Sequence, residues 1–355
     1  MTDASDTTPE PVGVVWETIT DEALDKVRSE AVFRYYNCIP IFTKDAIRDF
    51  GQQFEMAVAG QASVVSVRRL YGETVDFPVL SAHPYFPDSK PVIGFAPIQS
   101  LAGLGVYDDE SYPTLTTHLH VEYHSVVRDK ATGEVIPNID IQPIENVEAY
   151  FKRTLTKWEA TPACQHLRAS LKALLQRNSN MRKIDKIVAY ACGSLVDFET
   201  EESGDYPSLA RHSFYQHALV ITLLEILQNE RTDRDAGQKI RCYLQDPIYT
   251  NAERDMLAKF DLTVVDGQEG FLLTDDSTAV LSFAPNVCVK QIVLDISLPS
   301  MMIWCKVKDG DLLKTWTDPD SPRIRKLIGE HYDAVEFQDY EQRFQTAFYV
   351  KRAPT

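Results

Sequence analysis

The chain has no apolar stretch of the roughly 20 residues that a membrane-spanning helix needs, and it has no run of lysine and arginine. Its formal net charge is −16, whereas nucleic acids and anionic membranes attract positively charged proteins. We therefore expect neither nucleic acid nor a membrane among its partners. Residues 1–6 are acidic and polar, which predicts neither a signal peptide nor a transit peptide.

Cysteine is scarce and scattered, with six residues and no CxxC pair. This pattern excludes a zinc ribbon and a thioredoxin-like motif. Several cysteines lie in apolar runs, which is typical of free thiols in a reducing compartment, so we expect a cytoplasmic or nuclear protein. A Walker loop, an HExxH helix and a nucleophile elbow are also missing. The sequence therefore identifies no catalytic residue and no cofactor, and it leaves open whether the protein is an enzyme.

A length of 355 residues is enough for one large domain or two ordinary ones. Changes in composition predict a disordered tail over 1–12, an α+β region over 13–145, a helical connector over 146–180, and a Rossmann-like domain with a C-terminal extension over 181–355. In the α+β region we predict helices at 21–36 and 43–60, strands at 64–67, 92–95 and 115–127, and a hairpin turn at 129–134.

The second half of the chain alternates short apolar runs with helical patterns, which predicts an α/β fold. Right-handed crossovers would arrange the runs in a mostly parallel sheet flanked by helices. Thr161-Pro162, Thr250 and Ser321-Pro322 are helix start signals. The predicted strands cover 186–191, 240–244, 262–266 and 279–283, with a long helix over 208–230 and a final edge strand over 346–351.

Polar residues follow these strands, and ligands bind at the carboxyl ends of the strands in open α/β sheets. Glycine at 193 would let a backbone approach a ligand. The full GxGxxG motif is absent, and Asp246 follows the glycine at much more than the expected 20 or so residues, which disfavours a standard dinucleotide fold. The alternative to a ligand site is that the glycine forms an ordinary strand-to-helix turn and that the aspartates only cap turns. The predicted ligand-binding residues are Cys192, Gly193, Ser194, Arg211, Tyr215, Gln216, Asp246, Pro247, Tyr249, Asp266 and Asn286.

Histidines alternate along 118–124, so that His118, His120, Glu122 and His124 would share one face of a strand. Imidazole and carboxylate are suitable ligands for zinc or iron. Positions i and i+4 of a strand are about 13 Å apart, so one metal cannot reach them all, and His118 with His120 is the candidate pair. The same alternation is typical of a half-exposed strand with a polar outer face, which is the interpretation we favour.

One ordered set of motifs resembles the Sensitivity-to-Red-light-Reduced domain family over about residues 155–305. The motifs are the run 187–194 ending in Cys-Gly-Ser, Tyr-Gln-His-Ala-Leu at 215–219, and Gln-Asp-Pro-Ile-Tyr-Thr at 245–250. Trp158 and residues 163–167 are similar to the fungal branch. The family's pattern carries over onto Gly193, Ser194, Gln216, Asp246 and Pro247. Residues 284–288 depart from the family's Met-Pro-His-Cys-like segment because the histidine is missing.

The resemblance implies an intracellular regulatory protein without a settled catalytic activity; members are implicated in light and clock signalling in plants and in control of haem synthesis in animals. Our leading hypothesis is a regulatory protein that binds a small molecule, a nucleotide or a protein partner at its strand ends. The alternatives are an S-adenosylmethionine-dependent methyltransferase-like enzyme, a metal-binding N-terminal β domain and an acidic interaction scaffold.

Overall fold

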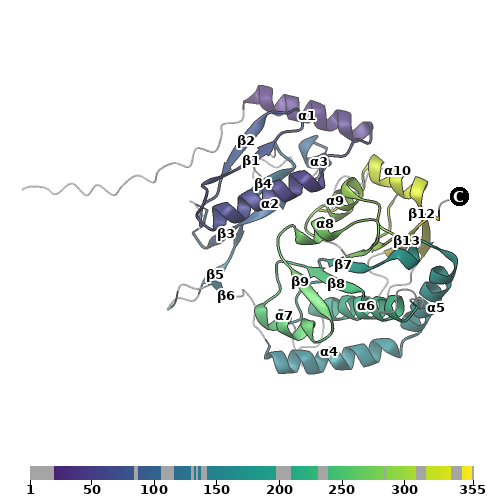
Figure 1. Cartoon of the computed structure of the whole chain (residues 1–355). Coiled ribbons are helices and arrows are strands. Elements are labelled where there is room, and N and C mark those ends of the chain that lie inside the picture. Colours follow the sequence, from purple (N-terminus) through teal and green to yellow (C-terminus); the bar gives the residue numbers. More distant parts are fainter. Residues whose placement is uncertain are drawn as a thin grey trace, which may run out of the picture.

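The computed structural model describes residues 20–83, 87–104, 116–128, 132, 135–136, 142–196, 209–230, 239–283, 285–308, 317–336 and 346–353. Over these residues the protein is α/β, with a seven-stranded sheet flanked by helices and a small N-terminal α+β region (Figure 1). The predicted tail over 1–12 lies outside the described residues, and so does the predicted turn over 129–134 except for Thr132.

The central sheet has the strand order β12-β13-β11-β10-β7-β8-β9. The five strands from β9 to β11 are parallel, whereas β13 runs antiparallel to both β11 and β12. The predicted strand at 346–351 is therefore present, but its prediction as an edge strand is wrong, because β12 pairs with its free side. The strands are β7 (Lys186–Tyr190), β8 (Arg241–Gln245), β9 (Leu262–Val265), β10 (Thr278–Ser282), β11 (Met301–Cys305), β12 (Tyr332–Glu336) and β13 (Thr346–Lys351).

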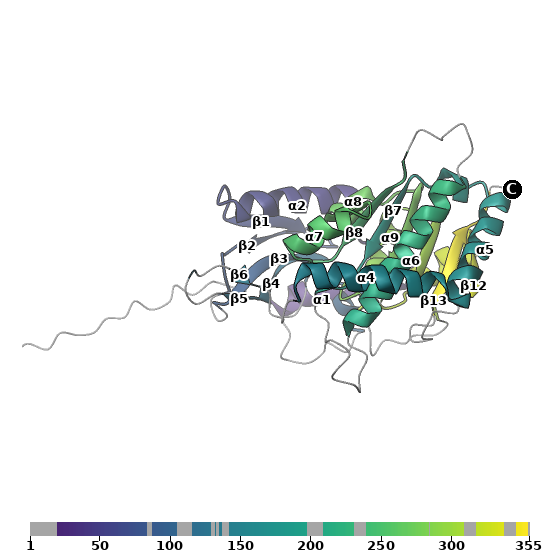
Figure 2. The ribbon, with the colours of Figure 1, turned by 90° about the horizontal axis from the view of Figure 1, so that it is seen from below.

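Two layers of helices cover the sheet, as Figures 1 and 2 show. Consecutive residues of β7 point to opposite faces: Ile187 and Ala189 join one apolar core, and Val188 and Tyr190 join the other. The first core is closed by α4 (Ile144–Glu159), α5 (Pro162–Arg177), η1 (Met181–Lys183), α6 (Leu209–Asn229) and α7 (Asn251–Ala258). The second core is closed by α8 (Glu269–Leu273), α9 (Val289–Ile296) and α10 (Pro322–His331).

The helix start signals in the sequence form the expected caps. The hydroxyls of Thr43, Thr161 and Ser321 each accept a hydrogen bond from the first turn of the helix that follows. Thr250 forms a complete capping box with Glu253. The predicted helical connector over 146–180 corresponds to α4 and α5, which pack on α6 in the first core. These helices are therefore part of one face of the α/β unit.

The N-terminal region packs on the opposite side, over α8, α9 and α10 (Figure 1). Val27 and Ala31 of its first helix share the second core with Ile292 of α9 and Ile328 of α10. The strands form three antiparallel pairs, β1 with β2, β3 with β4 and β5 with β6. The elements are α1 (Asp21–Tyr36), α2 (Lys44–Val58), β1 (Val64–Arg68), β2 (Thr74–Pro78), β3 (Ser89–Phe95), α3 (Ile98–Leu101), β4 (Leu119–Ser125), β5 (Val127–Arg128) and β6 (Val135–Ile136).

Candidate functional site

The order of the sheet reverses direction at β7. The chain proceeds from β7 outwards through β8 to β9, and then returns to the other side of β7 to form β10. In open α/β sheets, the crevice outside the carboxyl ends of the strands at such a switch point is where ligands bind. The segments that follow β7, β8 and β10 therefore form the carboxyl edge on which the site is built.

The turn after β7 has an unusual backbone. Ala191 has a φ of 54° and Gly193 a φ of 73°, and only glycine adopts such left-handed angles without a steric cost. A Cβ at Gly193 would lie 2.3 Å from the Ser213 hydroxyl of α6, so glycine also permits close packing against this helix. Uncommon backbone angles at a non-glycine residue gather at functional sites, and Ala191 places one at the carboxyl edge.

Asp246, which follows β8, connects two strand ends. Its Oδ2 accepts a hydrogen bond of 2.9 Å from the Gly193 amide, 53 positions earlier in the chain, and its Oδ1 accepts one of 3.2 Å from Ile248. The carboxylate is half-buried. Burial, together with the nearby Glu253 carboxylate, raises the pKa of Asp246, although the two amide donors oppose the rise.

A second carboxylate, Glu253 of α7, lies beneath the same turn and is fully buried. Its Oε1 accepts hydrogen bonds from the Ser194 hydroxyl at 2.9 Å and from the Leu195 amide at 2.6 Å. Its Oε2 accepts one from the Thr250 amide at 2.7 Å, which completes the capping box. Glu253 thus joins the turn after β7 to the start of α7.

A buried chain of hydrogen bonds links α6 to the loop after β8. Nδ1 of His217 lies 2.6 Å from the Ser213 carbonyl oxygen, and Nε2 lies 2.7 Å from the Tyr249 hydroxyl. Because a carbonyl only accepts, Nδ1 carries the proton, and Nε2 accepts from Tyr249. Burial lowers the pKa of His217 to about 4 and raises the pKa of Tyr249, so both groups are neutral at pH 7.

The neutral state of His217 makes stability depend on pH. Its pKa is about 4 in the folded protein and 6.5 as the ordinary value, so the unfolded chain binds the proton first as the pH falls. We expect this group to remove about 2 kcal/mol of folding free energy between pH 7 and pH 5. Denaturant unfolding of the wild type and of His217→Gln at both pH values measures the effect. Equal pH dependence of the two proteins would contradict the prediction.

The other predicted ligand-binding residues next to this network lie in the turn after β7 and on α6. Cys192 is buried, and burial raises the pKa of its thiol, which disfavours the nucleophilic thiolate. Gln216 lies on the α6 face that carries Ser213, as the i+3 spacing requires. Tyr215 packs edge-on to Trp158, with ring centroids 6.4 Å apart, in the helical layer. Arg211 is in the first turn of α6, but its side chain is not among those described.

Three more predicted residues lie exposed along the carboxyl edge: Pro247 after β8, Asp266 after β9 and Asn286 after β10. The Arg254 guanidinium donates two hydrogen bonds to the Asp266 carboxylate. Because β10 is on the far side of β7, Asn286 is separated from Asp266 by two intervening strands. The structure thus brings together the residues after β7 and β8, while Asp266 and Asn286 are at the margins.

His118 and His120 of β4 are both buried. The interpretation of their strand face as a half-exposed polar face is therefore wrong at these two positions. His118 packs edge-on to Phe42, and burial lowers its pKa to about 4. His120 lies over Gly94 of the paired strand and 3.5 Å from Glu122. Among the described residues, no group of three or more histidine, cysteine, aspartate or glutamate side chains is placed to hold a metal ion.

Sequence reasoning missed Glu253, Ser213 and His217 as members of the site, although a signal existed for Glu253. Glu253 lies three positions after the helix start signal Thr250, as a capping box requires, and it falls on the same helical stripe as Met256 and Leu257, three and four positions later. A carboxylate on an apolar stripe must find buried donors, and here they come from the turn after β7.

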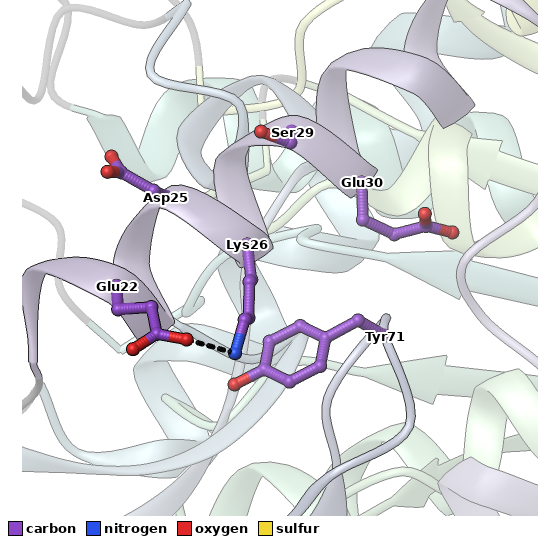
Figure 3. A pocket seen from close by; sticks show the side chains of 6 residues that line it. All are labelled: Glu22, Asp25, Lys26, Ser29, Glu30 and Tyr71. Carbon is purple, nitrogen blue, oxygen red and sulfur yellow. Dashed lines mark hydrogen bonds and ion pairs between the residues drawn. The ribbon is translucent and has the colours of Figure 1, made fainter.

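A separate hollow of about 600 Å³ lies in the N-terminal region, between α1 and the loop that carries Tyr71 (Figure 3). Lys26 within it donates a 2.6 Å hydrogen bond to Glu22. The wall is largely acidic, and a cluster of carboxylates alone does not define a ligand site. The hollow is lined by Glu22, Asp25, Lys26, Ser29, Glu30 and Tyr71.

Residues 164–348, just over half of the chain, match the SRR1 domain. This match begins after Trp158 and extends beyond residue 305 to include α10, β12 and the first half of β13. No curated protein and no solved structure matches the chain. Within the described residues, no helix has the length and apolar character needed to cross a bilayer. The chain belongs to the SRR1 domain family.

Proposed function

We propose that this chain is a regulatory protein of the cytoplasm or nucleus whose α/β domain binds a small ligand or a protein partner at the carboxyl edge of its sheet. The observation that carries the proposal is the bond between Gly193 and Asp246 across two strand ends. It lies beside the switch point, where open α/β sheets bind ligands. The regulatory role follows from what resemblance to the family implies, and no catalytic signature in the sequence opposes it.

The turn after β7 is held more firmly than a connecting loop requires. Asp246 and Glu253 bind amides of Gly193 and Leu195, and Ala191 is kept in a left-handed conformation. Such an arrangement fixes the position of backbone and carboxylate groups before a ligand arrives, which lowers the entropic cost of binding.

A thermal-shift screen of the purified protein tests the proposal, with S-adenosylmethionine, nicotinamide and adenine nucleotides, haem and divalent metals as probes. A ligand at a hundred times its dissociation constant stabilises the fold by about 2.7 kcal/mol. We expect Asp246→Ala to abolish the shift produced by the ligand that binds. The matched control is Asp261→Asn, on the amino edge of the sheet, where Asp261 is exposed and has a φ of 62°, an angle that asparagine tolerates.

The proposal fails if Gly193→Val and Asp246→Ala leave both ligand-induced stabilisation and the regulatory phenotype intact. Because a valine at position 193 would meet Ser213, that variant can lose its fold for structural reasons. Asp246→Ala is therefore the decisive variant. Partner capture that survives Asp246→Ala would instead favour the acidic interaction scaffold.

A methyltransferase-like enzyme is the second candidate, and the strand order favours it. Numbered from β7 as strand one, the order is 3-2-1-4-5-7-6, with strand seven antiparallel. An antiparallel strand seven inserted between strands five and six is typical of S-adenosylmethionine-dependent methyltransferases. The support for this candidate is therefore an analogy of fold. A calorimetric titration that shows no binding of S-adenosylmethionine or S-adenosylhomocysteine would remove this candidate.

A metal centre at His118 and His120 is a third and separate proposal. Its support is that Nδ1 of each imidazole is buried without a hydrogen-bond partner among the described residues. Elemental analysis of protein purified without an affinity tag tests it, and sub-stoichiometric metal would contradict it.

A further inference from the structure

We propose that the carboxyl edge binds a ribonucleoside that carries no phosphate, such as adenosine or an S-adenosyl compound, and that it discriminates against nucleotides. This inference rests on the proposed function and names the chemical class of its ligand. Three features of the edge support it: the position of Asp246, the occupied amides of the glycine turn, and the carboxylates at the neighbouring helix start.

Asp246 occupies the position from which an acidic residue binds ribose hydroxyls in doubly wound folds, after the strand that neighbours the first. A carboxylate has about four acceptor positions, and the amides of Gly193 and Ile248 use two of them. The side chain is half-buried, so the remaining positions can accept hydrogen bonds from two neighbouring hydroxyls.

The long sequence separation between Gly193 and Asp246 does not oppose this role. It arises because α6 and residues 197–208 lie between β7 and β8. The two strands are nevertheless direct neighbours with Tyr190 opposite Gln245, and the Gly193 amide and the carboxylate are 2.9 Å apart. In space, the glycine turn and Asp246 are therefore direct neighbours, as they would be in a fold where only about 20 residues separate the glycine from the acidic residue.

The same turn is unsuited to phosphate. Nucleotide-binding turns present free backbone amides and a helix start to the phosphate group. Here Gly193 donates to Asp246, and Leu195 donates to the buried Glu253. A phosphate at this turn would face two carboxylates and would have to displace them, at the cost of like-charge repulsion in a region of low dielectric. Neutral and cationic nucleosides avoid that repulsion.

At the start of α9, on the other side of the switch point, carboxylates likewise accept hydrogen bonds from the donors that could otherwise bind a phosphate. The amide of Lys290 donates a 3.0 Å hydrogen bond to Asp318, and the ammonium of Lys290 is paired with Asp320. This buried lysine is therefore already neutralised. Neither of these two positions at the switch point provides a free positive charge for a nucleotide.

One buried hydroxyl at the switch point has no hydrogen-bond partner among the described residues. Ser282 is the last residue of β10, lies opposite Tyr190 of β7, and is 1% exposed. An unpaired buried hydroxyl is uncommon in native structures. Because Ser282 shares a face of the sheet with Tyr190 and Val280, its hydroxyl lies on the side covered by α9, opposite the side covered by α6, and it adds no contact to a ligand at Asp246.

Isothermal titration calorimetry with five probes tests the inference: adenosine, 2′-deoxyadenosine, S-adenosylhomocysteine, ATP and NAD. We expect adenosine and S-adenosylhomocysteine to bind, and ATP and NAD to bind at least tenfold more weakly. Loss of a hydrogen bond to a charged acceptor should weaken 2′-deoxyadenosine by roughly 10- to 100-fold relative to adenosine. Asp246→Asn should weaken adenosine by a similar factor, while Asp261→Asn should leave its affinity unchanged.

Three results would overturn the inference: tighter binding of ATP or NAD than of adenosine, unchanged adenosine affinity in Asp246→Asn, or no binding of either nucleoside or S-adenosylhomocysteine. If ATP binds best and Arg211→Gln abolishes its binding, a phosphate site on α6 replaces the nucleoside site, and the proposed ligand site at the strand ends survives. If none of the five probes binds, the nucleoside class is excluded, and the thermal-shift screen still decides the proposed function. Circular dichroism and unfolding temperature of Asp246→Asn confirm that a loss of binding is not a loss of fold.

Discussion

Glu253→Ala is expected to lower the free energy of unfolding by about 3–5 kcal/mol, because it leaves buried donors without acceptors. The wild-type carboxylate accepts hydrogen bonds from the Ser194 hydroxyl and from the amides of Leu195 and Thr250. The substitution also removes half of the capping box at the start of α7, and loss of a cap costs about 1 kcal/mol by itself. Urea unfolding followed by circular dichroism measures the change.

Asp255→Ala on the same helix is the matched control, because Asp255 is exposed and surface substitutions usually stay within about 0.5 kcal/mol. Glu253→Gln provides a finer test. One end of the amide can still accept, whereas its NH₂ group meets donors that need an acceptor. We expect a substantial loss for this isosteric variant as well. A loss for Glu253→Ala no larger than that for Asp255→Ala would show that the contacts of Glu253 do not stabilise the fold.

Local signals in the sequence were sufficient to predict most elements of the α/β unit. Thr161-Pro162 and Ser321-Pro322 mark the starts of α5 and α10, and the apolar runs at 186–191 and 279–283 mark β7 and β10. These predictions succeed because capping hydroxyls and runs of apolar residues determine structure over a few neighbouring positions.

The order of the strands required the structure. The sequence patterns predict parallel strands but do not place β10 on the opposite side of β7 from β8, because the side to which a crossover returns depends on packing between distant segments. The same patterns do not predict β11 or β12, and without β12 the antiparallel β13 is expected at an edge. The strand order is the observation that favours the methyltransferase-like candidate.

The candidate site was predicted in part, and the omissions have a common cause. Gly193, Ser194 and Asp246 are predictable from the sequence because each follows a strand, and the structure joins Gly193 to Asp246 directly. His217 and Glu253 come from helices whose patterns predicted only packing and capping. Their contribution depends on how α6 approaches the loop after β8 and how α7 approaches the turn after β7, and sequence spacing does not show either approach.

The second large effect is expected at Asp295, which attaches the N-terminal region to the α/β unit. Its buried carboxylate on α9 accepts hydrogen bonds from the amides of Ile41 at 2.8 Å and Phe42 at 3.1 Å, and it pairs with Arg323 of α10 at 2.8 Å. Arg323 also donates a 3.0 Å hydrogen bond to the Cys38 carbonyl oxygen. Asp295→Ala leaves a partly buried cation and two amides without their acceptor, which should cost about 3–5 kcal/mol of unfolding free energy.

Two comparisons separate this attachment from an ordinary ion pair. Asp333→Ala breaks the exposed pair between Asp333 and Arg352, and exposed pairs contribute about 0–1 kcal/mol. The double variant Asp295→Leu, Arg323→Met removes both charges, a change that is often neutral for an isolated buried pair. Here the amides of Ile41 and Phe42 remain unpaired in the double variant, so we expect it to recover only part of the lost stability.

Full recovery would mean that the bonds to the N-terminal segment contribute little, and limited proteolysis of residues 20–128 would then proceed at the wild-type rate in the double variant. Partial recovery with faster proteolysis in both variants would show that Asp295 stabilises the protein mainly by holding the N-terminal region against α9 and α10.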